Sequence, residues 1–271
     1  DFALFDFILE PSPAARIIAG CDVHQKRLNR FRKLIDTEYR KYKIKGVAKT
    51  YEDFDKLIEN SDIDGIVVST PDHWHAIPSI NAMKAGKHVY CEKPMSHTIQ
   101  EGRAMEKIAR EYNCILQTGS MQRSRADFRK ACELVRNGYI GKIEKVWIEV
   151  GNPSAECNLP FQETPDYLNW DRWLGPAPLR SYHDIIVEKG WFPNWRWYRE
   201  YGGGILSDWG AHMFDIVQWA LDKDHTGPIK YVAPMEPTAS RGLVMHYDDG
   251  VEVEHRNFGR GFAVRFFGSK G

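Results

Sequence analysis

A lysine directly follows an acid at the end of a short apolar segment, in the stretch Tyr90-Cys91-Glu92-Lys93-Pro94. The apolar residues before Glu92 are typical of a buried strand, so Lys93 is predicted to lie where that strand ends. In parallel α/β sheets, ligands bind outside the carboxyl ends of the strands. Lys93 is therefore a candidate ligand contact, and the fixed φ of Pro94 would hold the turn that carries it.

A carboxylate and an imidazole four residues apart, Asp208 and His212, lie in a stretch that predicts a helix from Ser207 to about Leu221. Residues with this spacing share one face of a helix. A carboxylate beside an imidazole fixes its tautomer and raises its basicity, which is the arrangement of an oriented general base. An ordinary surface pair is the alternative. Three preceding glycines, at 202–204, would let a substrate approach closely and favour the functional interpretation.

Asp22 is predicted to end an earlier strand. A carboxylate at this place can accept hydrogen bonds from the ribose hydroxyls of NAD and repel the 2′-phosphate of NADP. Its alternative role is to cap the helix that begins near His24. The neighbouring Lys26 and Arg27 leave some room for NADP, although we expect NAD.

Hydroxyl groups end another predicted strand, at Ser69 and Thr70, and Pro71 turns the chain away from the sheet. His73 and His75 follow beside an aspartate, so a metal site must be considered. A spacing of two points side chains to different faces of a helix, and no cysteine or further histidine lies nearby at ligand spacing. We therefore predict no metal.

The first half of the chain alternates short β-branched segments with amphipathic ones, which predicts a parallel sheet covered on both faces, as in a doubly wound Rossmann domain. Further along, residues 142–150 alternate with period two, and two more strands flank Asp249-Gly250. These patterns predict an α+β domain with an open, mainly antiparallel sheet. The predicted domains are 1–121 for the dinucleotide and 122–271 for substrate binding and oligomerisation.

Composition excludes several classes of partner. Lys and Arg total 37 and Asp and Glu also total 37, so no net field favours nucleic acid. No segment approaches the roughly 18 apolar residues of a membrane span. The five cysteines lack C-x-x-C spacing and suit buried thiols better than disulfides. No signal peptide is recognised, and the compartment is left open between cytoplasm and periplasm.

The order of these motifs resembles the Gfo/Idh/MocA family of nicotinamide-dependent sugar oxidoreductases, from about Ile17 to Gly271. The motifs are STPxxxH, GKHVxCEKP, the segment FPNWRWYREYGGG and DxxxH. The resemblance implies catalytic positions at Lys93, Asp208 and His212. It implies that the cofactor is lined by Asp22, Ser69, Thr70, Pro71, His75, Glu92, Lys93 and Gln122. The residues predicted to bind the substrate are Arg123, Trp195, Arg196 and Tyr198.

The sequence departs from the family pattern at both ends. No glycine-rich turn of the G-x-G-x-x-G type is present, and the chain ends at FFGSKG where family members continue. We expect missing terminal segments, with the first strand and its glycine loop upstream of Asp1 and residues 1–11 in the first crossover helix. Loss of the cofactor is the alternative, and Asp22 argues against it.

The predicted function is hydride transfer between NAD and a carbinol of a sugar, glycoside or polyol. His212 would take the hydroxyl proton, Asp208 would orient it, and Lys93 would donate to the substrate oxygen. One alternative is an NAD-dependent glycoside hydrolase that acts by transient oxidation and elimination. Another is a non-catalytic sugar or dinucleotide sensor. A homo-oligomer is expected, because the family usually forms one and the open sheet has one uncovered face.

Overall fold

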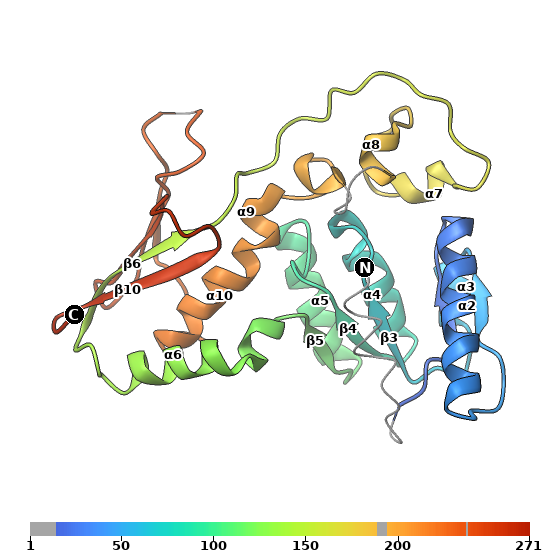
Figure 1. The fold of residues 1–271 in the computed structure, drawn as a ribbon, viewed down its shortest axis with the longest axis horizontal. Coiled ribbons are helices and arrows are strands. Elements are labelled where there is room, and N and C mark those ends of the chain that lie inside the picture. Colours follow the sequence, from blue (N-terminus) through green and yellow to red (C-terminus); the bar gives the residue numbers. More distant parts are fainter. Residues whose placement is uncertain (1–14, 189–193, 237) are drawn as a thin grey trace. The chain divides into compact units, whose positions relative to one another are not determined.

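The computed structural model describes residues 15–188, 194–236 and 238–271 (Figure 1). The described residues form two compact units. The first unit contains residues 15–117 and 158–188, and the second contains the remainder. The helix predicted over residues 1–11 lies outside the described residues, and the predicted domain boundary after residue 121 stays a prediction.

Strands and helices alternate through the first unit. They are β1 (Ala19–Cys21), α2 (Gln25–Lys41), β2 (Lys49–Tyr51), α3 (Phe54–Ile58), β3 (Gly65–Val68), η1 (Asp72–Trp74), α4 (Ala76–Lys84), β4 (His88–Cys91), α5 (Ile99–Glu111) and β5 (Leu116–Thr118). β1 pairs with β2 in parallel, and β3 pairs in parallel with β4, which is followed by β5 in the same sheet. Parallel neighbours joined through helices confirm the predicted doubly wound class.

The core of the first unit explains where its strands stop. Val68, Val89 and Cys91 are buried among side chains of α4 and α5, and Glu92 is the first polar residue beyond them on β4. α5 begins at a complete capping box, in which Thr98 and Glu101 each bond the other's backbone N–H. The apolar ends of β3 and β4 therefore place their polar successors at one edge of the sheet.

A later segment of the chain returns to the first unit. We call residues 165–188 the strap; it contains α7 (Trp170–Leu174) and α8 (Asp184–Val187). Trp170 and Trp173 stack with their ring centroids 4.9 Å apart. The indole of Trp74 donates to the carbonyl of Trp173 at 2.8 Å. Tryptophans of this stretch thus pack the strap against η1 of the first unit.

An open sheet with helices on one face forms the second unit. Its helices are η2 (Met121–Ser124), α6 (Ala126–Arg136), η3 (Asn194–Trp197), α9 (Gly204–Asp208) and α10 (Gly210–Ala220). Its strands are β6 (Ile143–Glu149), β7 (Lys230–Val232), β8 (Val244–His246), β9 (Glu252–His255) and β10 (Ala263–Gly268). The strand order is β10-β6-β9-β8-β7, with β6 and β9 parallel and the other neighbours antiparallel. This confirms the predicted open, mainly antiparallel sheet.

The core of the second unit lies between α10 and the sheet. Val146 and Ile148 of β6 pack with Met213 and Val217 of α10, and all four are essentially buried. Gly250 closes the β8–β9 hairpin with a φ of +87°, a conformation that glycine adopts without strain. No helix in the described ranges is long and apolar enough to cross a bilayer.

Candidate functional site

The loops after β3 and β4 are joined by His75. The buried His75 ring contacts the carbonyl of Thr70 through Nε2 at 2.9 Å and the carbonyl of Pro94 through Nδ1 at 2.6 Å. Thr70 and the preceding Ser69 are exposed at this edge. His75 therefore fixes the two loops to each other and leaves the hydroxyls accessible to a ligand.

Glu92 and Lys93 lie where β4 leaves the core. The Glu92 amide donates to the carbonyl of Val68 at 2.9 Å, which extends the β3–β4 pairing by one residue. Its carboxylate accepts the Lys93 amide at 3.1 Å, and both side chains are partly exposed. The peptide bond from Lys93 to Pro94 is cis. Just inside, burial raises the pKa of the Cys91 thiol to about 12, so this cysteine is a core residue and not a nucleophile.

Asp22 follows β1 and is partly buried. Its Oδ1 accepts the His24 amide at 2.8 Å, and His24, not Asp22, caps α2. Burial raises the pKa of Asp22, and the hydrogen bond from His24 opposes that rise. Within the described part of the chain, Oδ2 has no hydrogen-bond partner. Asp22 therefore keeps an acceptor for a ligand hydroxyl.

In the second unit, Asp208 and His212 are buried, with 2% and 4% of their surfaces exposed. Asp208 Oδ1 accepts a hydrogen bond from Arg196 Nε at 3.2 Å. A buried carboxylate needs a compensating charge, and Arg196 supplies it. The Trp209 ring lies edge-on to His212, with centroids 5.7 Å apart. The two residues predicted to form a general base are thus enclosed, and Asp208 is fixed by Arg196.

The single helix predicted to start at Ser207 is wrong in its boundaries. α9 already begins at Gly204, and Asp208 ends α9, whereas His212 lies in the first turn of α10. Gly204 has a φ of +74°, and a Cβ there would lie 2.4 Å from the backbone of Pro153. The helix starts early because glycine alone permits this close approach to the neighbouring chain.

The predicted substrate residues of η3 lie in different surroundings. Trp195 and Arg196 are buried, and the guanidinium lies 4.2 Å from the Trp195 ring centroid. Tyr198 is partly exposed. The exposed aromatic of this turn is Trp197, at 44%, which the sequence prediction did not single out. Several tryptophans lie close together in this segment, and the sequence does not distinguish the exposed Trp197 from the tryptophans that pack in the core.

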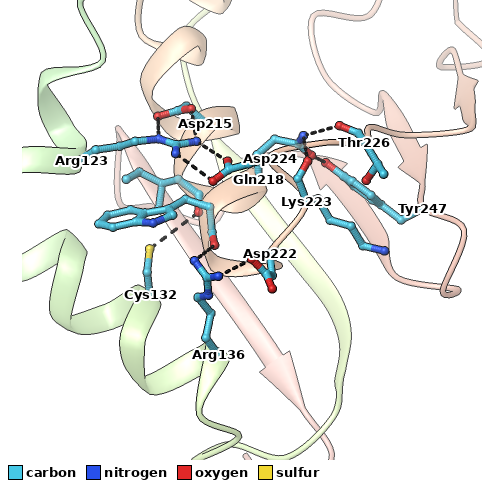
Figure 2. A network of polar contacts seen from close by, with 12 residues as sticks. Arg123, Cys132, Arg136, Asp215, Gln218, Asp222, Lys223, Asp224, Thr226 and Tyr247 are labelled. Carbon is cyan, nitrogen blue, oxygen red and sulfur yellow. Dashed lines mark hydrogen bonds and ion pairs between the residues drawn. The ribbon is translucent and has the colours of Figure 1, made fainter.

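Arg123 is held by two aspartates (Figure 2). It binds both oxygens of Asp215, at 2.8 and 2.7 Å, and both oxygens of Asp224, at 3.2 and 2.7 Å. The hydrogen bonds that Arg123 donates to Asp215 and, to a lesser extent, to Asp224 raise the pKa of Arg123, and the bond from Arg123 lowers the pKa of Asp224. This cluster ties η2 to α10. The preceding Gln122 is 7% exposed, and its Oε1 lacks a partner among the described residues.

The structure thus connects some of the predicted residues within each unit. Thr70, His75 and Pro94 are joined at the sheet edge of the first unit, and Arg196 joins Asp208 in the second. The ligand roles of all the predicted site residues stay predictions. In the described ranges, no group of three or more His, Cys, Asp or Glu side chains is arranged to hold a metal.

Two family models match the chain in succession. Residues 5–120 match an oxidoreductase family model described as an NAD-binding Rossmann fold, and residues 130–258 match the C-terminal alpha/beta domain of the same family. The chain belongs to the Gfo/Idh/MocA oxidoreductase family. The family and the NAD-binding Rossmann fold predicted from the sequence are therefore confirmed.

Individual members of the Gfo/Idh/MocA family show the same likeness. Myo-inositol 2-dehydrogenase of Thermotoga maritima is 32% identical over 78% of this chain and 48% of its own length. The 1,5-anhydro-D-fructose reductase of Ensifer adhaerens is 27% identical over 66% of this chain and 44% of its own length. The chain thus spans about half the length of these relatives.

A solved structure supports the fold. Scyllo-inositol dehydrogenase from Lactobacillus casei, solved with NAD(H) and scyllo-inositol, matches 98% of this chain and 70% of its own with a TM-score of 0.61. Sequence identity is 20%, so this likeness bears on the fold alone.

Proposed function

We propose that this protein is an NAD-dependent oxidoreductase that acts on a carbinol of a sugar or polyol. The observation that carries the proposal is the enclosed Arg196–Asp208 pair, together with the buried His212 of α10, in a chain of this family. Two relatives, a myo-inositol 2-dehydrogenase and a 1,5-anhydro-D-fructose reductase, support a polyhydroxy substrate.

The residues of the first unit fit NAD. The Asp22 carboxylate keeps one oxygen without a protein partner in the described chain, and the exposed Ser69 and Thr70 hydroxyls lie at a strand end. Such a carboxylate accepts hydrogen bonds from ribose hydroxyls. In the second unit, Gln122 Oε1 is a separate buried acceptor that a ligand N–H would satisfy. When bound, NAD would supply the redox chemistry, and the protein would supply placement.

The remaining steps belong to the chain's own residues. His212 takes the proton of the substrate hydroxyl, and Asp208 fixes the tautomer and orientation of that ring. Arg196 keeps Asp208 in place and compensates its buried charge. Lys93 donates a hydrogen bond to the substrate oxygen as negative charge develops there. The joint action of Lys93 and His212 rests on the order of the motifs, because they belong to different units.

Two alternatives make different predictions. A glycoside hydrolase that works by transient oxidation regenerates NAD in every cycle, so reduced cofactor would not accumulate. A sensor would bind sugar and NAD without turnover. The named relatives do not favour hydrolysis, since they are dehydrogenases and a reductase.

The test is a panel of inositols, anhydrosugars, aldoses and glycosides, each incubated with NAD, with NADH absorbance as the readout. We expect stoichiometric NADH formation with at least one polyol. Glycoside cleavage without net NADH would instead support the hydrolase. Binding without turnover across the panel would support the sensor.

A further inference from the structure

The strap contacts the start of α2, beside the carboxyl end of β1. The carbonyl of Tyr167 accepts the Gln25 amide at 2.8 Å. The Asn169 amide donates to the carbonyl of Val23 at 3.0 Å. All of these residues belong to the first unit. The strap is therefore fixed next to the place where we propose that the adenosine ribose binds.

The strap engages both cations of the first turn of α2. Lys26 Nζ lies 3.4 Å from the centroid of the Tyr167 ring. Arg27 Nη2 donates to the carbonyl of Val187 at 2.6 Å. In Rossmann domains that accept NADP, a nearby arginine binds the 2′-phosphate. In this protein, Lys26 or Arg27 would have to break its contact with the strap before it could bind a 2′-phosphate.

The strap also adds a carboxylate near Asp22. His24 Nδ1 accepts the Arg27 amide at 3.4 Å, which places the ring proton on Nε2. Nε2 then donates to Glu188 Oε1 at 2.8 Å. The backbone amide of His24 donates to Asp22. His24 thus contacts two carboxylates, Asp22 through its backbone amide and Glu188 through its ring.

We propose that the strap, chiefly through Glu188, is a determinant of the preference for NAD over NADP. This inference rests on the proposed function and deepens it. Asp22, which is bonded to the His24 amide, repels a 2′-phosphate. Glu188, which is bonded to the His24 ring, places a second carboxylate beside the same site. Tyr167 and the Val187 carbonyl engage the cations that would otherwise attract the phosphate.

The decisive variant is Glu188→Gln, because the amide oxygen can still accept from His24 while the charge is lost. We expect the ratio Kd(NADP)/Kd(NAD) to fall about fivefold at low salt, with NAD affinity unchanged within about twofold. Tyr167→Leu should release Lys26 and lower the ratio about twofold. Glu163→Gln is the matched control, since Glu163 is an exposed carboxylate shortly before the strap. It should leave the ratio unchanged.

Calorimetric titration of the folded chain with both cofactors gives the readout, and Asp22→Ala serves as the positive control because it should narrow the preference. If NAD binds and Asp22→Ala narrows the preference while Glu188→Gln does not, this inference is overturned and the proposed function stands. An effect of Glu188→Gln that is equal at low and high salt would also overturn it. Failure of the chain, extended upstream to include the expected glycine loop, to bind either cofactor would overturn both.

Discussion

The first unit presents its predicted ligand residues on accessible loops, whereas the second encloses its predicted catalytic residues. Ser69 and Thr70 are exposed, and the loops that carry them are fixed through backbone carbonyls. Asp208 and His212 are buried, and Asp208 is fixed by a charged side chain. A cofactor that must enter and leave needs accessible groups, while a general base needs a fixed orientation.

The comparison implies that substitutions in the two units impair different properties of the protein. In the first unit, a lost side chain should change affinity or rate and leave folding nearly intact, since surface changes rarely exceed about 0.5 kcal/mol. In the second unit, a lost partner leaves a buried charge, which destabilises the fold as well.

The largest effect is expected for the predicted catalytic residues. Lys93→Met and His212→Ala should each lower kcat roughly 10²-fold or more, because each removes a donor or a proton acceptor from the transition state. Lys93→Met should leave the melting temperature and the NAD affinity nearly unchanged. Lys107→Met, at an exposed lysine of α5, is the control. Full turnover by Lys93→Met would contradict its assigned role.

Breaking the buried ion pair should affect stability most. Arg196→Met leaves Asp208 without its charged partner, and removal of one member of such a pair costs about 3–5 kcal/mol of unfolding free energy. Arg196→Met combined with Asp208→Asn should recover part of that loss. Urea denaturation of the single and double variants measures both. An unchanged midpoint for Arg196→Met would show that the pair does not hold Asp208.

Substitution of Arg123 distinguishes a structural role of this residue from a substrate-binding role. With its bonds to Asp215 and Asp224, Arg123→Met should destabilise the second unit by about 1 kcal/mol, since the cluster is partly solvated. KM for the sugar should change little. A large rise in KM without loss of stability would instead support the substrate contact predicted from the sequence.

The smallest effect concerns pH. Burial lowers the pKa of His255, which is 1% exposed and contacts the carbonyl of Val150. The unfolded chain therefore binds a proton more readily than the folded chain below about pH 6.5, and stability falls from that pH downward. Above that pH the His255 ring is neutral in both the folded and the unfolded chain, so it adds no pH dependence to the stability. Thermal melts across this range should show a shallower loss for His255→Gln than for the parent. Parallel curves would contradict the assignment.

Short-range patterns predicted most of the fold. The strand His88–Cys91 and the Thr98–Glu101 capping box depend on neighbouring residues, and both are present as predicted. The hairpin at Asp249-Gly250 depends on a local backbone conformation that glycine permits. The start of α9 was missed because it depends on the close approach of Pro153, about fifty residues away in the chain.

The contacts between distant segments could not be read from the sequence. Arg196 and Arg123 were predicted to bind substrate, but the structure also gives them carboxylate partners, Asp208 and Asp215, that lie 12 and 92 residues away. The strap sequence shows no hydrophobic periodicity. Its prolines and tryptophans therefore gave no indication that it packs on the first unit. The sequence thus indicated which residues could carry charge or stack, and tertiary packing decided their partners.

The central proposal, which rests on the order of the motifs, is that Lys93 and His212 both serve the catalytic step. A double-mutant cycle on kcat/KM with Lys93→Met and His212→Ala tests it directly on any polyol that the parent oxidises. The account predicts that the combined variant loses far less than the product of the single losses, because residues that act as a unit are not additive. Losses that multiply would show independent action and would contradict the account.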